Sequence, residues 1–374
     1  MTAYPRHAQA LAALADRGRL RSLAPRLGHD FASNDYLGLA GSDVLRDAAR
    51  AALDRGVAVG AGGSRLLRGN DSEHEALEAL AARHFSTEAA LFMGGGFAAN
   101  QAIFASLPMP DDLVLYDALI HASAHDGMRL GRAETQSFVH NDANDAQAQI
   151  TTWRTKGGKG RIWLAIESLY SMGGDFAPLA DFAALAAAQD AVLVVDEAHA
   201  TGLYGPTGRG LTEGMAHDAN LLTLHTCGKA LGISGALICG AADLTQTLIN
   251  KARGFIYATA PSPLNAALVA AALHHLHANP QRRTATQALV DHAHATAAKH
   301  GFTGLQSQIL PILLGTDQRV MQVAKSLQQR GYDIRGIRPP TVPRGTARLR
   351  ISITLNTTAD VISQMFEDLA QVTA

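Results

Sequence analysis

The chain has 374 residues, of which 47% are hydrophobic and 17% are charged, so it can bury a large core and disorder is not expected. Its formal net charge is −1, and its lysines and arginines form no long block, which argues against a nucleic-acid-binding surface. No apolar run approaches the roughly 20 residues that span a bilayer. Two cysteines, Cys227 and Cys239, do not make a disulfide framework, and we expect a cytoplasmic protein.

The N-terminal residues predict a helix followed by a turn region. Residues 4–17 form an alanine-rich amphipathic pattern, which Gly18 loosens and Pro25 breaks. The arginines of this segment are also typical of an organelle transit peptide, but Asp16 and the lack of a serine-rich stretch argue against one. Residues 31–38 predict a short strand that runs into a turn.

From there to about residue 240, short apolar runs alternate with helical stretches. This order is typical of an α/β domain whose mainly parallel sheet is covered by helices. The predicted strands are residues 90–93, 113–116, 161–166, 191–195, 221–225 and 235–239.

The C-terminal third has a different pattern. Residues 264–300 are rich in alanine and leucine and predict helix, and they precede strands at 309–314 and 347–353 with helices at 317–330 and 358–372. We therefore predict three parts, since a chain of this length holds two or three structural units. They are an N-terminal arm (1–45), a large α/β domain (46–265) and a small α+β domain (266–374).

Glycines follow the first predicted strand of the α/β domain and open a helix. The N–H groups exposed by Gly94, Gly95 and Gly96, together with the positive end of the helix dipole, favour a bound phosphate. A plain flexible turn would use the same glycines. Ligands of open α/β sheets bind at the carboxyl ends of the strands, so this turn is a candidate site, and the motif alone does not decide between the two interpretations.

Three polar side chains follow other predicted strands. Asp196 can pair with a cationic nitrogen such as the pyridinium of pyridoxal phosphate (PLP), although a solvated loop carboxylate explains it too. Lys229 lies among small residues, where its amine can form a Schiff base with a carbonyl cofactor, whereas most lysines are surface residues. His121 can stack on a planar ring or be an ordinary loop histidine.

Three other motifs resemble known binding sites but depart from the patterns that those sites require. His121 and His125 have metal-ligand spacing, but there is no His-Glu-x-x-His motif and no carboxylate placed as a third ligand, so we expect no metal. Residues 157–160 lack the Ser or Thr that a P-loop requires. Residues 60–65 begin like a dinucleotide fingerprint and end in arginine, which leaves a dehydrogenase as an alternative from another class.

Taken together and in this order, the motifs are similar to those of a known family. Over nearly its whole length the chain resembles the α-oxoamine synthases, which are fold type I PLP-dependent transferases with a mainly parallel central sheet. The motifs that carry the resemblance are Ser33–Gly38, Gly62–Arg65, Gly96–Asn100, His121–Ser123, Glu167, Ser171–Asp175, Asp196–His199, Thr226–Lys229 and Ile337–Arg350.

The resemblance implies a role for each matching residue around the cofactor. Lys229 would hold PLP as a Schiff base, Asp196 would pair with the ring nitrogen, and His199 would bond the ring hydroxyl. His121 would stack on the ring. The remaining cofactor contacts would come from Gly96, Phe97, Ser171, Thr226 and, across the interface of a homodimer, Thr259.

The resemblance also implies substrates. Arg338 would hold a carboxylate, with Asn34 and Glu167 close by, and Arg21 and Thr341 would contact substrate as well. The run at 337–350 is most similar to that of members that join L-alanine to a pimeloyl thioester of CoA or of a carrier protein.

Alternatives and departures remain within the resemblance. Sister enzymes use glycine with acetyl-CoA or succinyl-CoA, or serine with a fatty acyl thioester. A non-catalytic PLP-fold protein is disfavoured by the intact Lys229. Gly95 stands where the family has Ser or Thr, which removes one hydroxyl from the expected phosphate site, and Ala200 replaces a glycine.

Overall fold

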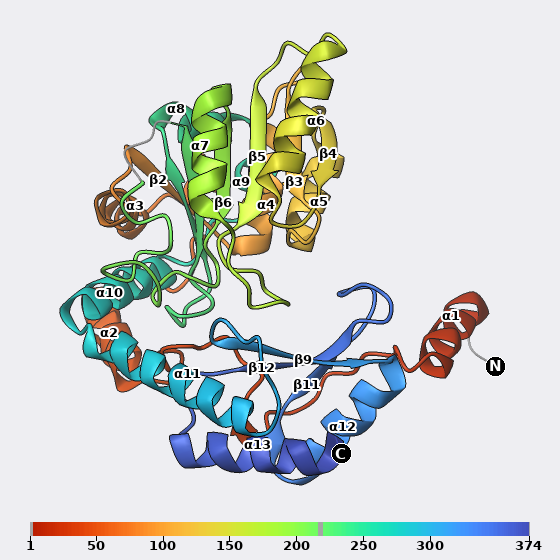
Figure 1. The fold of residues 1–374 in the computed structure, drawn as a ribbon. Helices are drawn as coiled ribbons and strands as arrows, with labels where there is room; N and C mark the ends of the chain where they lie inside the picture. Colours follow the sequence, from red (N-terminus) through yellow and green to blue (C-terminus); the bar gives the residue numbers. More distant parts are fainter. Residues whose placement is uncertain (1–2, 216–219, 374) are drawn as a thin grey trace. The chain divides into compact units, whose positions relative to one another are not determined.

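A computed structural model describes residues 3–215 and 220–373 (Figure 1). The chain divides into two compact units. The larger unit consists of Leu37–Ser171 and Phe176–Thr284, and the smaller unit of the residues up to Tyr36, Met172–Asp175 and the residues from Ala285 onward. The predicted division at residues 45 and 265 stays a prediction.

The larger unit is built on a seven-stranded sheet with the order β2-β8-β7-β6-β5-β3-β4. Strands β4, β3, β5, β6 and β7 pair in parallel, whereas β8 is antiparallel to both β7 and β2. The predicted mainly parallel sheet is therefore confirmed. In sheet order the strands are Ala89–Met93, Ala236–Gly240, Leu221–Thr226, Val192–Asp196, Ile162–Glu167, Leu113–Asp117 and Glu134–Phe138.

Helices cover both faces of this sheet, because successive strand residues point to opposite sides. Trp163 and Ala165 of β5 belong to one apolar cluster, with residues of α4 (Gly96–Ser106), α5 (Ala122–Leu130), α8 (Ala242–Lys251) and α9 (Arg253–Ile256). Ile162, Leu164 and Ile166 belong to the other, with residues of α6 (Ala143–Thr155) and α7 (Leu179–Gln189). The continuous apolar strands seen in the sequence follow from this double coverage.

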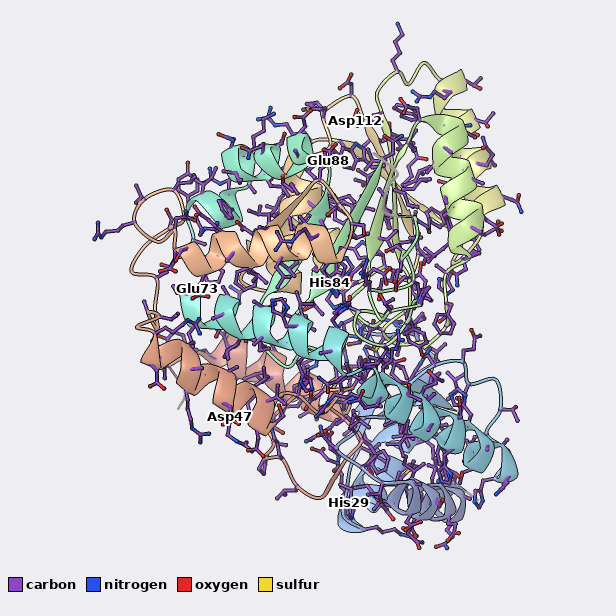
Figure 2. The ribbon with its side chains drawn as sticks, turned by 90° about the vertical axis from the view of Figure 1, so that its left-hand side faces the viewer. His29, Asp47, Glu73, His84, Glu88 and Asp112 are labelled. Atoms are coloured by element: carbon purple, nitrogen blue, oxygen red, sulfur yellow. The ribbon has the colours of Figure 1, made fainter. Side chains whose placement is uncertain are left out.

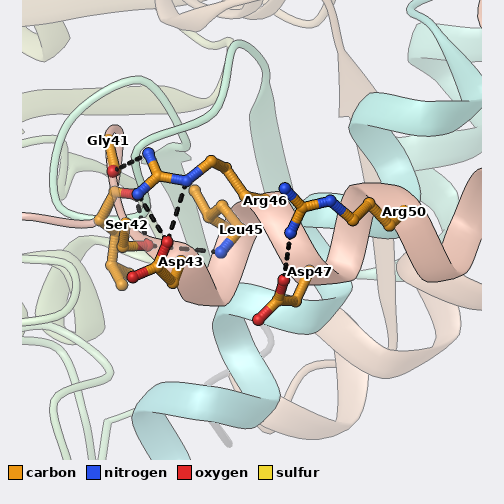
Figure 3. Close-up of polar contacts among 8 residues, drawn as sticks. Gly41, Ser42, Asp43, Leu45, Arg46, Asp47 and Arg50 are labelled. Carbon is orange, nitrogen blue, oxygen red and sulfur yellow. Dashed lines mark hydrogen bonds and ion pairs between the residues drawn. The ribbon is translucent and has the colours of Figure 1, made fainter.

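Local capping fixes where the other helices of this unit begin. Helix α2 (Asp43–Asp54) starts at Ser42, whose Oγ accepts the Leu45 N–H at 3.3 Å, and Arg46 donates to the Asp43 carboxylate at 2.7 Å (Figure 3). Helix α3 (Ser72–His84) begins with a capping box at Asp71. It carries Glu73 in its first turn and His84 in its last, which Figure 2 shows at opposite ends. The Glu73 carboxylate suits the positive end of the helix dipole, whereas burial lowers the pKa of His84 to about 4.

Asp112 ties the start of β3 to its neighbours, at the place labelled in Figure 2. Its Oδ1 accepts the Arg161 N–H at 2.7 Å, and its Oδ2 accepts the indole N–H of Trp163 at 2.9 Å. Because Asp112 is buried, these bonds replace the water that its carboxylate loses, and they fix the start of β5 against β3.

The smaller unit has an antiparallel sheet in the order β11-β12-β9, formed by Arg335–Ile337, Ala347–Ser352 and Ile309–Gly315. Residues of α11 (Gln281–Lys299), α12 (Asp317–Gln329) and α13 (Ala359–Thr373) share its apolar core. A two-residue parallel pair joins β1 (His29–Asp30) to β10 (Tyr332–Asp333). Helix α1 (Pro5–Asp16) has no buried residue.

Three sequence predictions differ from the structure. The strand β4 was not predicted, because its sequence Glu-Thr-Gln-Ser-Phe is too polar for an apolar run. Residues 264–300 form two helices, α10 (Pro263–Ala278) and α11, since Pro280 cannot continue the first. Residues 31–38 form bends and turns after the short β1.

Among the described residues, no helix is both long and apolar enough to cross a membrane.

Truncation of the central strand tests this account of the core. Leu164 of β5 is fully buried, so we expect Leu164→Ala to lower the free energy of unfolding by about 2–5 kcal/mol through the cavity it leaves. Leu130→Ala on α5 is the matched control, because its side chain is 64% exposed, and we expect a change within about 0.5 kcal/mol. Urea unfolding measures both, and equal effects would contradict the assigned layers.

Candidate active site

The carboxyl ends of three parallel strands gather polar side chains in the larger unit. Strand β5 ends at Glu167, β6 at Asp196 and β7 at Thr226. Glu167 and Asp196 are register partners, so their side chains leave the same edge of the sheet. This edge is where open α/β sheets bind their ligands.

Lys229 follows β7 and is half-buried, and its Nζ lies 2.8 Å from Nε2 of the buried His199. The lysine is presented by a tight loop, in which the Gly232 N–H donates to the Lys229 carbonyl and the Ile233 N–H to the Cys227 carbonyl, each at 2.9 Å. A lysine held in this way can act as nucleophile or base, since it has few conformations to lose.

Asp196 is buried and its two oxygens accept hydrogen bonds from different elements. The side-chain amide of Asn100, on α4, donates to Oδ2 at 2.8 Å, and the Ala198 N–H donates to Oδ1 at 2.9 Å. These donors fix the orientation of the carboxylate. The arrangement suits a fixed anion that pairs with a protonated ring nitrogen.

His121 joins the same network through Ser123. Asn100 donates to Ser123 Oγ at 3.0 Å, while the hydroxyl and the N–H of Ser123 lie 2.7 and 3.3 Å from Nδ1 of His121. Two donors that converge on Nδ1 favour the neutral ring with its proton on Nε2. Desolvation lowers the pKa of His121, Lys229 adds to this effect, and Asp196 opposes it.

The glycines before α4 leave room for an anion. The helix N-cap is Gly95, which supplies no side-chain cap, and a Cβ on Gly94 or Gly95 would meet no atom within 4 Å. A Cβ on Gly96 would lie 3.2 Å from Oγ1 of Thr226. The first N–H groups of α4 and the Thr226 hydroxyl therefore meet at one place, where a phosphate fits.

Glu167 and Ser171 lie beside these groups. Glu167 is buried and its Oε2 accepts the Ser171 N–H at 3.1 Å. Burial raises the pKa of Glu167 well above its ordinary value of 4.5, the Asp196 carboxylate raises it further, and Lys229 partly opposes both.

These residues fit PLP by the chemistry of their donors and acceptors. The larger unit supplies an amine for the aldehyde and a carboxylate for the ring nitrogen. It also supplies an imidazole for a ring face and an open helix N-terminus for the phosphate. Within the two described stretches of the chain, no group of three or more His, Cys, Asp or Glu side chains could hold a metal ion.

The predicted substrate residues, apart from Glu167, belong to the smaller unit. Arg21, Arg338 and Thr341 line one cavity of about 510 Å³, and Arg21 lies 3.4 Å from the Thr341 hydroxyl. Arg338 also donates to the Gly18 carbonyl. Asn34 instead accepts a hydrogen bond from the Tyr36 hydroxyl at 3.1 Å. Their contact with a substrate stays a prediction.

Two predicted cofactor contacts are exposed in the chain. The Phe97 side chain is 50% exposed at the start of α4, and Thr259 lies on an exposed segment after α9. The role of Thr259 depends on a second subunit and stays a prediction. Sequence reasoning gave no role to Asn100 and Ser123, although both lie in quoted motifs, because their function depends on how α4 and α5 pack.

The sheet and the lysine beside a fixed carboxylate are those of the fold type I PLP-dependent transferases, and comparisons with known proteins agree. The family model for aminotransferase class I and II matches residues 28–368. The chain is 39% identical to the 8-amino-7-oxononanoate synthase of Anaeromyxobacter dehalogenans strain 2CP-1, covering 91% of this chain and 85% of that protein. It is 40% identical to that of Chromobacterium violaceum, over 86% and 83%.

Solved structures show the same fold. The serine palmitoyltransferase of Sphingomonas wittichii superposes with a TM-score of 0.88 at 25% identity, covering 98% of this chain and 96% of that one. The 8-amino-7-oxononanoate synthase of Francisella tularensis gives 0.75 at 27% identity, over 92% and 97%. The chain belongs to the aminotransferase class I and II family and, within it, to the 8-amino-7-oxononanoate synthases, which are PLP-dependent acyltransferases.

The dehydrogenase alternative is wrong. The family match contradicts it, and the glycines at 60–63 lie in a loop between α2 and α3. A dinucleotide fingerprint requires a strand directly before these glycines and a helix that they open.

Loss of the Asn100 amide tests the network around Asp196. We expect Asn100→Ala to weaken PLP binding by roughly 10- to 100-fold, because a hydrogen bond to a charged group contributes about 1.5–3 kcal/mol. Titration of the cofactor-free protein, followed by absorbance, measures the dissociation constant. Asn144→Ala, at an exposed position on α6, is the control, and equal constants for both variants would contradict the role of Asn100.

Proposed function

We propose that the chain condenses L-alanine with a pimeloyl thioester, carried by CoA or a carrier protein, to give 8-amino-7-oxononanoate, CO2 and a free thiol in biotin biosynthesis. The observation that carries the proposal is Lys229, held 2.8 Å from His199 at the edge of the sheet that also holds Asp196. The names of relatives that are 39–40% identical support the choice of substrates.

Bound PLP supplies an electron-poor ring that accepts the negative charge left when a bond to the amino-acid Cα breaks. Lys229 would hold the cofactor covalently and, when its amine is free, would take the Cα proton as general base. Nε2 of His199 lies at hydrogen-bond distance from Nζ, 2.8 Å, and so orients the amine. Asp196, fixed by Asn100, would pair with the ring nitrogen and favour its protonated form.

The overall reaction sets what the other residues must do. A C–C bond forms between the alanine Cα and the thioester carbonyl carbon, the C–S bond breaks, the alanine carboxyl leaves as CO2, and a proton returns to Cα. Arg338 suits the carboxylate because a guanidinium binds two oxygens at once. The neutral His121 offers a flat face without adding positive charge.

The proposal extends to assembly and location. We place the active site at the interface of a homodimer, with Thr259 contacting the phosphate bound in the partner subunit. We place the protein in the cytoplasm, which agrees with the two buried cysteines, both of which are free thiols.

Replacement of Lys229 tests its double role. We expect Lys229→Ala to lower turnover by at least roughly 10³-fold, because both the covalent attachment and the general base are lost. Lys251→Ala, at an exposed lysine on α8, controls for loss of a lysine. Near-normal thiol release by Lys229→Ala would contradict both roles proposed for Lys229.

Neutralising Asp196 separates binding from chemistry. Asp196→Asn keeps the shape of the side chain but cannot stabilise a protonated ring nitrogen, so we expect PLP to remain bound when the cofactor is in excess and turnover to fall by roughly 100-fold or more. Absorbance reports the bound cofactor, and thiol release reports turnover. An unchanged rate in the PLP-loaded variant would refute this role of Asp196.

The amino donor is tested by thiol release from pimeloyl-CoA with L-alanine, glycine or L-serine. We expect release that depends on L-alanine. Release with glycine or L-serine alone would move the function to a sister reaction of the same family, while PLP dependence would stand.

A further inference from the structure

Three carboxyl side chains end neighbouring strands of the large sheet. Asp117 ends β3, Glu167 ends β5 and Asp196 ends β6, and β5 lies between the other two. All three are buried. Glu167 is the register partner of Asp196. On the other side of β5, Ala165 is the register partner of Tyr116, and Asp117 follows Tyr116 directly. Glu167 is therefore the middle carboxyl group in strand order. It shares a face of the sheet with Asp196, whereas Asp117 follows Tyr116 and its side chain leaves the opposite face.

The two outer groups each accept hydrogen bonds from several donors. Asp117 accepts from His140 Nδ1 and from the N–H groups of Leu119 and Asn141, each at 2.8 Å. Burial alone would raise the pKa of Asp117, but these bonds outweigh it and hold the pKa below its ordinary value. Asp196 accepts from Asn100 and Ala198, as described above.

Glu167 has far less support for a negative charge. Its Oε2 accepts one hydrogen bond, from the Ser171 N–H, and its buried Oε1 has no hydrogen-bond partner among the residues that the structure describes. The ionisable groups that act on it are Asp196, Asp117 and Lys229, and the Tyr170 phenol lies close by. Two of these three are carboxylates, and each disfavours a negative charge on Glu167.

We propose that Glu167 keeps a proton on Oε1 at neutral pH and is a positioning residue that leaves Asp196 to carry the negative charge beside Lys229. The direction of its pKa shift agrees, since burial and Asp196 both raise it. A second negative charge here would favour the ammonium form of Lys229, whereas nucleophile and base both require the free amine. This role is independent of which thioester the protein uses.

Infrared difference spectroscopy on the full-length PLP-bound protein tests the proton directly. At pH 7 we expect a C=O stretch of a protonated carboxyl group that is absent from Glu167→Gln. Glu197→Gln is the matched control, because Glu197 is also buried at this edge, accepts from Ser168, Leu211 and Thr212, and has its pKa raised by burial; the band that Glu167→Gln removes must persist in it. A wild-type band lost above about pH 5, near the ordinary range of glutamate, would overturn the proposal.

The pH dependence of unfolding gives a second readout that needs no substrate. A buried acid with a raised pKa binds more protons in the folded protein than in the unfolded chain. The free energy of unfolding therefore falls as the pH rises above the pKa of the acid in the unfolded chain, about 4.3. We expect the unfolding constant of the wild type to grow, relative to that of Glu167→Gln, by up to about tenfold per pH unit in that window. A constant ratio would contradict the proposal. If Glu167→Gln does not fold, the titration of the wild-type band decides alone, and neither test depends on the proposed reaction.

Discussion

The in-register parallel pairing of β5, β6 and β7 is the constraint on which the rest of the site depends. It brings Glu167 and Asp196 to one edge as partners and places the Lys229 loop directly after β7. The strands are buried on both faces by helices, so a shift of one residue would expose apolar side chains and move the carboxylates to the wrong face. Packing of the core thus fixes the positions of the reactive groups.

Different hydrogen-bond partners then give residues of similar type different roles. Asp196 receives donors from α4 and from the loop after β6, whereas Glu167 receives a single backbone N–H. His121 faces two donors at Nδ1, while His199 pairs with Lys229 through Nε2. The open N-terminus of α4 adds the positive field that a phosphate needs.

Much of this could be predicted from the sequence, for identifiable reasons. Buried parallel strands are short apolar runs, so the polar residues that follow them, such as Asp196 and Lys229, could be found without a structure. The edge strand β4 could not, because only one side of it is paired and its sequence is polar. The roles of Asn100 and Ser123 depend on the packing of α4 and α5, and the contrast between Glu167 and Asp196 depends on strand register, neither of which a single sequence contains.

The central claim is that Lys229 carries the cofactor at the edge of the sheet. Reduction of the PLP-bound protein with borohydride, followed by proteolysis and mass spectrometry, locates the attachment directly. The account predicts one phosphopyridoxyl group, on the peptide that contains Lys229. Attachment to a different lysine, or a protein that binds PLP and yields no labelled peptide, would contradict it.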